Sequence, residues 1–219
     1  MSTSPICPEL IRNSGLRDRF DRLRFELLHR DGRRVISDWF RLAQKKLNCD
    51  PDESFEPFIY AWIAFNSWAS CCTDLDQDRQ IIEALSRSTE LIQQFEQSMT
   101  NSDAIRASAE RFRSMWPVFN VKDLRRRRIP MFLDLDRPNM IAHYFQNGAD
   151  SFAPLCYRRH IDGGEDVPLD WPHIIWAIYQ VRCNLFHGDK APHSEIDRVL
   201  VHSGLQVLVR FLADRGYVA

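Results

Sequence analysis

Apolar residues recur along most of this chain at the spacing of helices, and the two-residue alternation of strands is almost absent. Apolar positions three and four residues apart predict amphipathic helices at 16–29, 35–47, 79–98, 102–116, 137–147 and about 194–214. Residues 55–72 and 171–187 are apolar on most sides, which predicts helices buried between several neighbours. The pattern therefore predicts an all-α fold.

Capping and breaking residues set the expected ends of these helices. Asp31-Gly32 is expected to separate the first two helices, and Pro117 to end the helix at 102–116. Asp170 is a suitable N-cap for the apolar helix 171–187, and Gly188 a suitable stop after it. These signals support the order of helices that the periodicity predicts.

The segment 117–170 lacks the regular apolar spacing of the rest. Five prolines and the pair Gly163-Gly164 interrupt it, and only the short helix at 137–147 is expected inside it. We interpret 1–219 as a single helical domain in which 117–170 is an insertion packed on the helical core.

Composition limits the classes of function. The chain of 219 residues has the hydrophobic and charged content of an ordinary globular domain, without a signal peptide or a run long enough to span a membrane. We therefore expect a cytoplasmic protein that does not use a membrane. Its six cysteines form no Cys-x-x-Cys pair, so buried thiols are expected, with no metal site and no cofactor.

Charge is unevenly distributed although the net charge is only −1. Residues 50–110 carry 3 basic against 12 acidic side chains, whereas 111–128 carry 7 against 1. The strongest block is Arg125, Arg126, Arg127 and Arg128. One interpretation is a clamp on the RNA backbone, which bears a negative charge at each nucleotide. The other is a solvated loop that pairs with the acidic segment 50–110.

The most informative motif is Arg182-Cys183-Asn184-Leu185-Phe186-His187-Gly188, at the end of the apolar helix. Arginine keeps its charge and offers a planar fork of donors to phosphate oxygens, and histidine exchanges protons near neutral pH. Five residues of helix separate Arg182 and His187 by about 140° and about 7.5 Å. They can converge if the helix frays at His187 or if two subunits meet. Alternatively, both side chains simply complement the helix dipole.

This motif, the earlier apolar helix FEPFIYAWIAFNSW and the final helix after the motif together resemble the HEPN superfamily. The resemblance covers about 16–98 and 171–214 and implies an up-and-down helical bundle. It implies a homodimer with the site near the interface, in which His187 transfers protons and Arg182 binds phosphate. The family often has an asparagine directly after the arginine; here Cys183 stands at that position, as a supporting residue, and Asn184 follows it as the polar residue of the catalytic set. Asn66, the other supporting residue, either faces this site or is bonded to backbone in the core.

The resemblance implies a metal-independent endoribonuclease that cleaves RNA by attack of the 2′-OH. It also suggests a toxin or anti-phage effector restrained by an antitoxin or another regulatory protein. The aromatic, partly polar face formed by Trp176, Tyr179, Gln180, Cys183 and His187 independently predicts burial against a partner. The alternative function is a catalytically inactive HEPN-like module that binds RNA, nucleotide or a protein.

Overall fold

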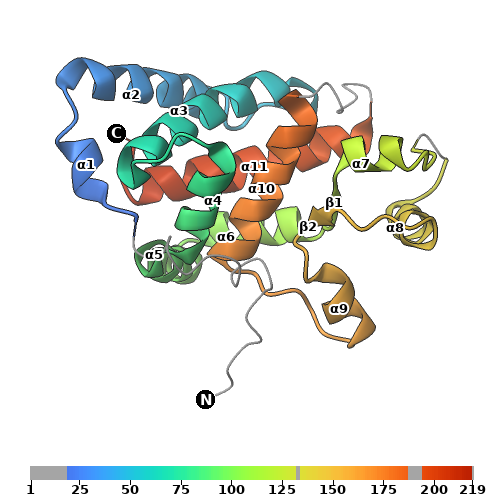
Figure 1. Ribbon diagram of the computed structural model, residues 1–219. Coiled ribbons are helices and arrows are strands. Elements are labelled where there is room, and N and C mark those ends of the chain that lie inside the picture. The colour runs from blue at the N-terminus through green and yellow to red at the C-terminus, as the bar shows by residue number, and fades with distance from the viewer. Residues whose placement is uncertain (1–18, 132–133, 187–193, 219) are drawn as a thin grey trace.

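The protein folds into packed α-helices with one very small sheet (Figure 1). The computed structural model describes residues 19–131, 134–186 and 194–218. Their helices are α1 (Arg22–Glu26), α2 (Arg30–Lys45), the 3₁₀ helix η3 (Pro51–Glu53), α3 (Phe55–Thr73), α4 (Asp78–Arg87), α5 (Thr89–Asn101), α6 (Asp103–Arg113), α7 (Val121–Arg126), α8 (Arg137–Gln146), α9 (Tyr157–Asp162), α10 (Trp171–Phe186) and α11 (Glu195–Asp214). The prediction of an all-α fold is confirmed.

Helix α3 lies within the main hydrophobic core, as its apolar character on most sides predicts. Phe58, Phe65 and Trp68 are completely buried, and Trp62 is nearly so. The helix packs along α2, and it also contacts α11, α4 and α1. Because neighbours cover it on several sides, α3 is a fixed support for side chains on α4 and α10.

Helices α10 and α11 complete this core. Helix α10 packs against α4, α5 and α11, and it also contacts both strands of the small sheet. Its buried stripe includes Ile174, Ile178 and Val181, the residues that the helical spacing selects. The C-terminal end of α10 therefore lies between the helical core and the insertion.

The insertion 117–170 gathers beyond α10 and α11 at one end of the molecule (Figure 1). Strands β1 (Val118–Phe119) and β2 (Phe152–Ala153) pair in antiparallel fashion and bring its two halves together. A second hydrophobic cluster holds α7 and α8 near this sheet, formed by Phe119, Leu124, Ile129, Met140, Tyr144, Ala149 and Phe152. Ile196 of α11 packs on it, which joins the cluster to the core helices.

Several elements differ from the prediction. Among the described residues, α1 covers only Arg22–Glu26 of the helix predicted at 16–29, α6 already ends at Arg113, and α7 and α9 form in 117–170, where only 137–147 is expected to be helical.

Two further differences have a clear local reason. Helix α2 already begins at Arg30, because the His29 ring accepts a hydrogen bond from the backbone N–H of Asp31 and caps the helix there. The expected break at Asp31-Gly32 is therefore wrong. The helix predicted at 79–98 is divided into α4 and α5, because the Ser88 hydroxyl accepts from Leu91 N–H and starts a new helix.

Other predicted ends are confirmed. Asp170 caps α10 by accepting from His173 N–H at 3.1 Å, and Ser194 caps α11 by accepting from Asp197 N–H at 3.3 Å. Gly188 lies outside the described residues. Within the described ranges, every helix is too short or too polar to cross a membrane.

Candidate functional site

Arg182 lies near the C-terminal end of α10, in an aromatic setting built by three helices. Its Nη2 atom forms an ion pair with Asp78 Oδ2 of α4 at 2.6 Å, and both side chains are 23% exposed. The guanidinium lies 5.5 Å from the ring centre of Trp62 and 4.8 Å from that of Phe186, within the range of cation–π contacts. Its Nε is buried without a hydrogen-bond partner among the described residues. The positive charge of Arg182 is thus held in place, and its Nε–H group makes no hydrogen bond to the described residues.

Tyr179 extends this aromatic surface by almost one turn of α10. Its ring lies 6.2 Å from Trp62 and 5.9 Å from Trp176, and Cys183 is a neighbour of its hydroxyl group. Burial, together with the neighbouring Cys183, raises the pKa of Tyr179 to about 12. The phenol is therefore uncharged at neutral pH and can donate a hydrogen bond.

We call this surface the Arg182 face and define it by Trp62, Asp78, Arg79, Trp176, Tyr179, Arg182, Cys183 and Phe186. Arg79 belongs to it because its guanidinium lies 6.0 Å from the ring centre of Trp176. Phe186, at the end of α10, is 46% exposed. Trp62 is only 2% exposed and lies beneath the face, so its exposed rings are Phe186 and, in part, Trp176 and Tyr179. Exposed rings beside arginine side chains are typical of a surface that binds unstacked bases.

Asn66 lies one helical turn after Trp62 on α3, which places it on the same side of that helix. Its Oδ1 atom is buried and has no hydrogen-bond partner in the described part of the chain. A buried polar atom without a partner costs about 1–3 kcal/mol. The side-chain carbonyl of Asn66 therefore accepts no hydrogen bond from backbone among the described residues.

Asn184 does not join Arg182, because two residues of helix rotate a side chain by about 200°. It is 2% exposed and faces the insertion. Its Nδ2 donates to Phe119 O at 2.8 Å, while its Oδ1 accepts from Val121 N at 3.2 Å and from Gln180 Nε2 at 3.0 Å. These bonds tie β1 and the start of α7 to α10. The structure thus gives Asn184 a positioning role, whereas we had expected a catalytic one.

His187 lies outside the described residues, so the geometry of the predicted Arg182–His187 pair is not described. Phe186 is the last described residue of α10.

The arginine block lies at the end of α7, and all four of its residues are exposed. Arg126 and Arg127 both bind Asp123, and Arg127 also binds Asp150 at 2.6 Å. Burial opposes ionisation of Asp123, but the hydrogen bonds from the two arginines outweigh it and lower the pKa of this carboxyl group. These partners belong to the insertion and not to the acidic segment 50–110. Part of the charge of the block is thus already balanced locally.

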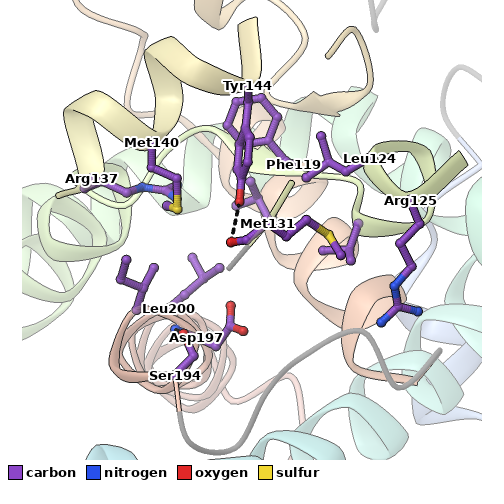
Figure 2. A pocket seen from close by; sticks show the side chains of 13 residues that line it. Phe119, Leu124, Arg125, Met131, Arg137, Met140, Tyr144, Ser194, Asp197 and Leu200 are labelled. Atoms are coloured by element: carbon purple, nitrogen blue, oxygen red, sulfur yellow. Dashed lines mark hydrogen bonds between the residues drawn. The ribbon is translucent and has the colours of Figure 1, made fainter. Parts of the chain in front are cut away.

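A pocket that sequence reasoning missed lies between the insertion and the start of α11 (Figure 2). Its volume is about 110 Å³, and apolar side chains form most of its wall. Arg137, Tyr144 and Asp197 bring polar atoms to it from α8 and α11. These residues come from α8 and α11, which are far apart in the sequence, so no local pattern indicated the site.

A second missed arrangement joins Cys156, His173 and Asp170. His173 Nε2 lies 3.1 Å from the Cys156 sulfur, and its Nδ1 is hydrogen-bonded to Asp170. Thiol, imidazole and carboxylate in this order can activate a nucleophile. However, Cys156 is only 2% exposed and His173 only 5%. In this structure the three residues therefore fasten the start of α9 to the start of α10.

Among the described residues, no three His, Cys, Asp or Glu side chains are grouped so that they could hold a metal ion. Comparison of the chain with models of protein families, with curated proteins and with solved structures gave no match. The proposals below are therefore based on the residues and contacts of this chain and on the resemblance of its motif.

Proposed function

We propose that this protein is a metal-independent endoribonuclease. The observation that supports the proposal best is Arg182, held by Asp78 between two aromatic rings and placed five residues before His187. A guanidinium fixed in this way is oriented before substrate arrives, which reduces the cost of ordering it in the transition state.

The Arg182 face suits single-stranded RNA. Unstacked bases bind to aromatic rings and to guanidinium planes, and each base stacked on an aromatic side chain contributes about 1–3 kcal/mol. Phe186 presents an exposed ring beside Arg182, and Arg79 adds a second positive charge on the same face.

RNA carries its own nucleophile beside each phosphate, so a base, an acid and a stabilising cation suffice for cleavage. In the proposed reaction, His187 of one subunit accepts the 2′-OH proton as the oxygen attacks phosphorus. The His187 of a second copy protonates the departing 5′-oxygen, and the Arg182 guanidinium stabilises the charge on the phosphorane. The products are a 2′,3′-cyclic phosphate and a 5′-OH. Asn184 takes no part, because its amide is bonded to Phe119, Val121 and Gln180.

This reaction requires two copies of the motif, so the proposal includes a homodimer joined near the Arg182 face. The exposed ring of Phe186 fits such an interface, since aromatic residues are enriched in interface cores. In the cell, an enzyme of this kind would act as a toxin or anti-phage effector that an antitoxin or another regulatory protein restrains.

The ion pair between Arg182 and Asp78 favours a second candidate function. A carboxylate 2.6 Å from the guanidinium already occupies one side of the fork that would grip phosphate. If the pair persists when RNA is bound, the protein is a non-catalytic module that binds RNA, nucleotide or another protein through the aromatic part of the face.

The test is cleavage of a mixed RNA pool in EDTA by wild type, Arg182→Gln and His187→Ala, with analysis of the product ends. Arg79→Gln is the matched control, because it also removes an arginine from the Arg182 face but lies outside the motif. Asp78→Asn separates the two candidate functions because it releases Arg182 from its ion pair. Circular dichroism and gel filtration establish that each variant is folded and in the same oligomeric state.

We expect wild type and Arg79→Gln to leave cyclic phosphate and 5′-OH ends, and we expect Arg182→Gln and His187→Ala to lose at least a hundredfold in rate. A folded wild type and a folded Asp78→Asn that both bind RNA without cutting it would favour the binding module. Cleavage that survives in His187→Ala would refute the proposed chemistry.

A further inference from the structure

Arg137, the first residue of α8, is a cation enclosed in the insertion without a counter-charge in contact. Its Nη2 donates to two backbone carbonyls, Met115 O and Pro117 O, each at 2.6 Å. Its Nε is buried without a hydrogen-bond partner among the described residues. Asp197 is the acidic side chain that acts on its charge, from across the pocket. Burying a charge that is not paired costs free energy, so we expect a ligand or another interaction to compensate the charge of this side chain.

The pocket of about 110 Å³ lies directly beside this arginine. In Figure 2, Arg137 reaches the pocket next to Met140, and Tyr144 lies above the cavity with its hydroxyl bonded to Met131 O at 3.3 Å. Asp197 approaches from α11 on the other side. The rest of the wall is mainly apolar and includes Val118, Phe119, Leu124, Met131, Met140, Ile196 and Leu200.

We propose that this pocket binds a small organic monocarboxylate, with the carboxylate at Arg137 and the apolar part against Met131, Met140 and Leu200. Nη2 already donates to two backbone carbonyls, so the carboxylate would accept from the remaining N–H groups of the guanidinium. The buried position strengthens this charge-assisted bond because water competes less. An inorganic oxyanion would pair with Arg137 but would make no apolar contact with the wall of the pocket. A wholly apolar ligand would leave the charge unpaired.

The volume limits the size of the ligand. A cavity of about 150 Å³ accommodates a benzene ring of six non-hydrogen atoms, so about 110 Å³ accommodates about four or five, a carboxylate with one or two further carbons. The charges of the lining also fit one negative charge. Arg125 and Arg137 are cations and Asp197 is a carboxylate that interacts favourably with Arg137, so the net charge of the lining is positive. Burial lowers the pKa of Arg137, yet an arginine remains protonated at neutral pH, so the cation persists and a monoanion neutralises it.

The site is separate from the Arg182 face and has no role in the proposed reaction. It is nevertheless linked to α10, because Asn184 bonds Phe119 and Val121, and both of these residues line the pocket. A ligand would therefore stabilise the insertion against the core.

The test is isothermal titration of the full chain with propanoate, with its neutral isostere propanamide and with inorganic phosphate. Propanoate has five non-hydrogen atoms, and at about 0.8 kcal/mol per atom its expected Kd is on the order of 1 mM. Arg137→Met removes the charge, and Met131→Trp narrows the cavity while the arginine is kept. The matched control is Arg158→Met, since Arg158 is an exposed arginine of α9 that does not line this pocket.

We expect propanoate to bind wild type and Arg158→Met equally, and to bind folded Arg137→Met and Met131→Trp at least tenfold more weakly. Propanamide and phosphate should bind at least tenfold more weakly than propanoate. Equal binding of propanamide would overturn the role of Arg137, and equal binding of phosphate would overturn that of the apolar wall. Binding that survives in Met131→Trp, or no binding of propanoate up to about 20 mM, would overturn the site itself. These readouts do not depend on RNA cleavage.

Discussion

Replacing Asn184 by alanine tests the role that the structure gives this residue. The side chain is 2% exposed and is the partner of two backbone groups, Phe119 O and Val121 N. Alanine would leave both groups without these bonds. A buried backbone group that loses its partner costs about 1–3 kcal/mol, so two of them cost about 2–6 kcal/mol.

Partial exposure of these backbone groups to water lowers the expected loss of unfolding free energy. Phe119 is 5% exposed, but Val121 is only partly buried, so water can reach its N–H more easily. We therefore expect Asn184→Ala to lower the free energy of unfolding by about 2–4 kcal/mol, a large part of the 5–15 kcal/mol typical of a domain. The matched control is Gln180→Ala, which removes one bond to Asn184 but leaves both backbone groups paired. It should cost less than about 1 kcal/mol.

Urea unfolding measures the total cost, and hydrogen exchange shows where it acts. Amide protons of residues 118–131 and 149–157 should exchange faster in Asn184→Ala than in wild type, while those of α3 should change much less. An Asn184→Ala protein with wild-type stability and exchange but without nuclease activity would refute this reasoning and restore a catalytic role for Asn184.

Three further predictions concern α10 and α11. His202 is 7% exposed, and burial, reinforced by nearby arginines, lowers its pKa below the ordinary value of 6.5. The stability that the neutral ring contributes is complete above pH 6.5 and is lost as pH falls below it, by up to about 1.4 kcal/mol per pH unit. Urea midpoints between pH 7.5 and 5.5 should therefore decline more in wild type than in His202→Gln, and parallel curves would contradict the assignment. A Cβ at Gly204 would lie 3.4 Å from Phe112 and 3.5 Å from Phe58, so Gly204→Ala fits and should gain up to about 1 kcal/mol of helix propensity. Gly204→Leu should instead lower the melting temperature, and equal melting of the two variants would show that α11 is loosely packed there. Asp170→Ala removes the N-cap of α10 and should cost about 0.5–2 kcal/mol in urea unfolding, so unchanged stability would mean that another group caps the helix.

The helices that the sequence predicts well are those whose signal is local. Residues 55–72 are apolar on most sides and form α3, and the apolar stripe after Asp170 forms α10. Ser88 shows the limit of this approach, because apolar spacing continues through it although its hydroxyl starts a new helix. A serine within a periodic pattern is too common to be interpreted as a break.

The candidate site was less predictable, because its partners come from distant parts of the chain. The motif identifies Arg182, but Trp62 and Asp78, which hold it, lie on α3 and α4. Asn184 lies 65 residues after Phe119 and 63 after Val121, and both lie in the segment without helical periodicity. Spacing within the motif thus suggests that Arg182 and Asn184 act together, whereas rotation along the helix separates them.

The last turns of α10 therefore have two different tasks on opposite sides. Arg182 faces the aromatic surface formed with α3 and α4, and Asn184 faces the insertion. Any loss of activity on mutation of this motif is ambiguous until stability is measured beside it, since damage to the Asn184 contacts would also disturb the helix that carries Arg182. If the ribonuclease proposal holds, Arg182→Gln should abolish cleavage without loosening residues 118–131, and Asn184→Ala should loosen that segment first. The two variants together separate the chemistry of this helix from its packing.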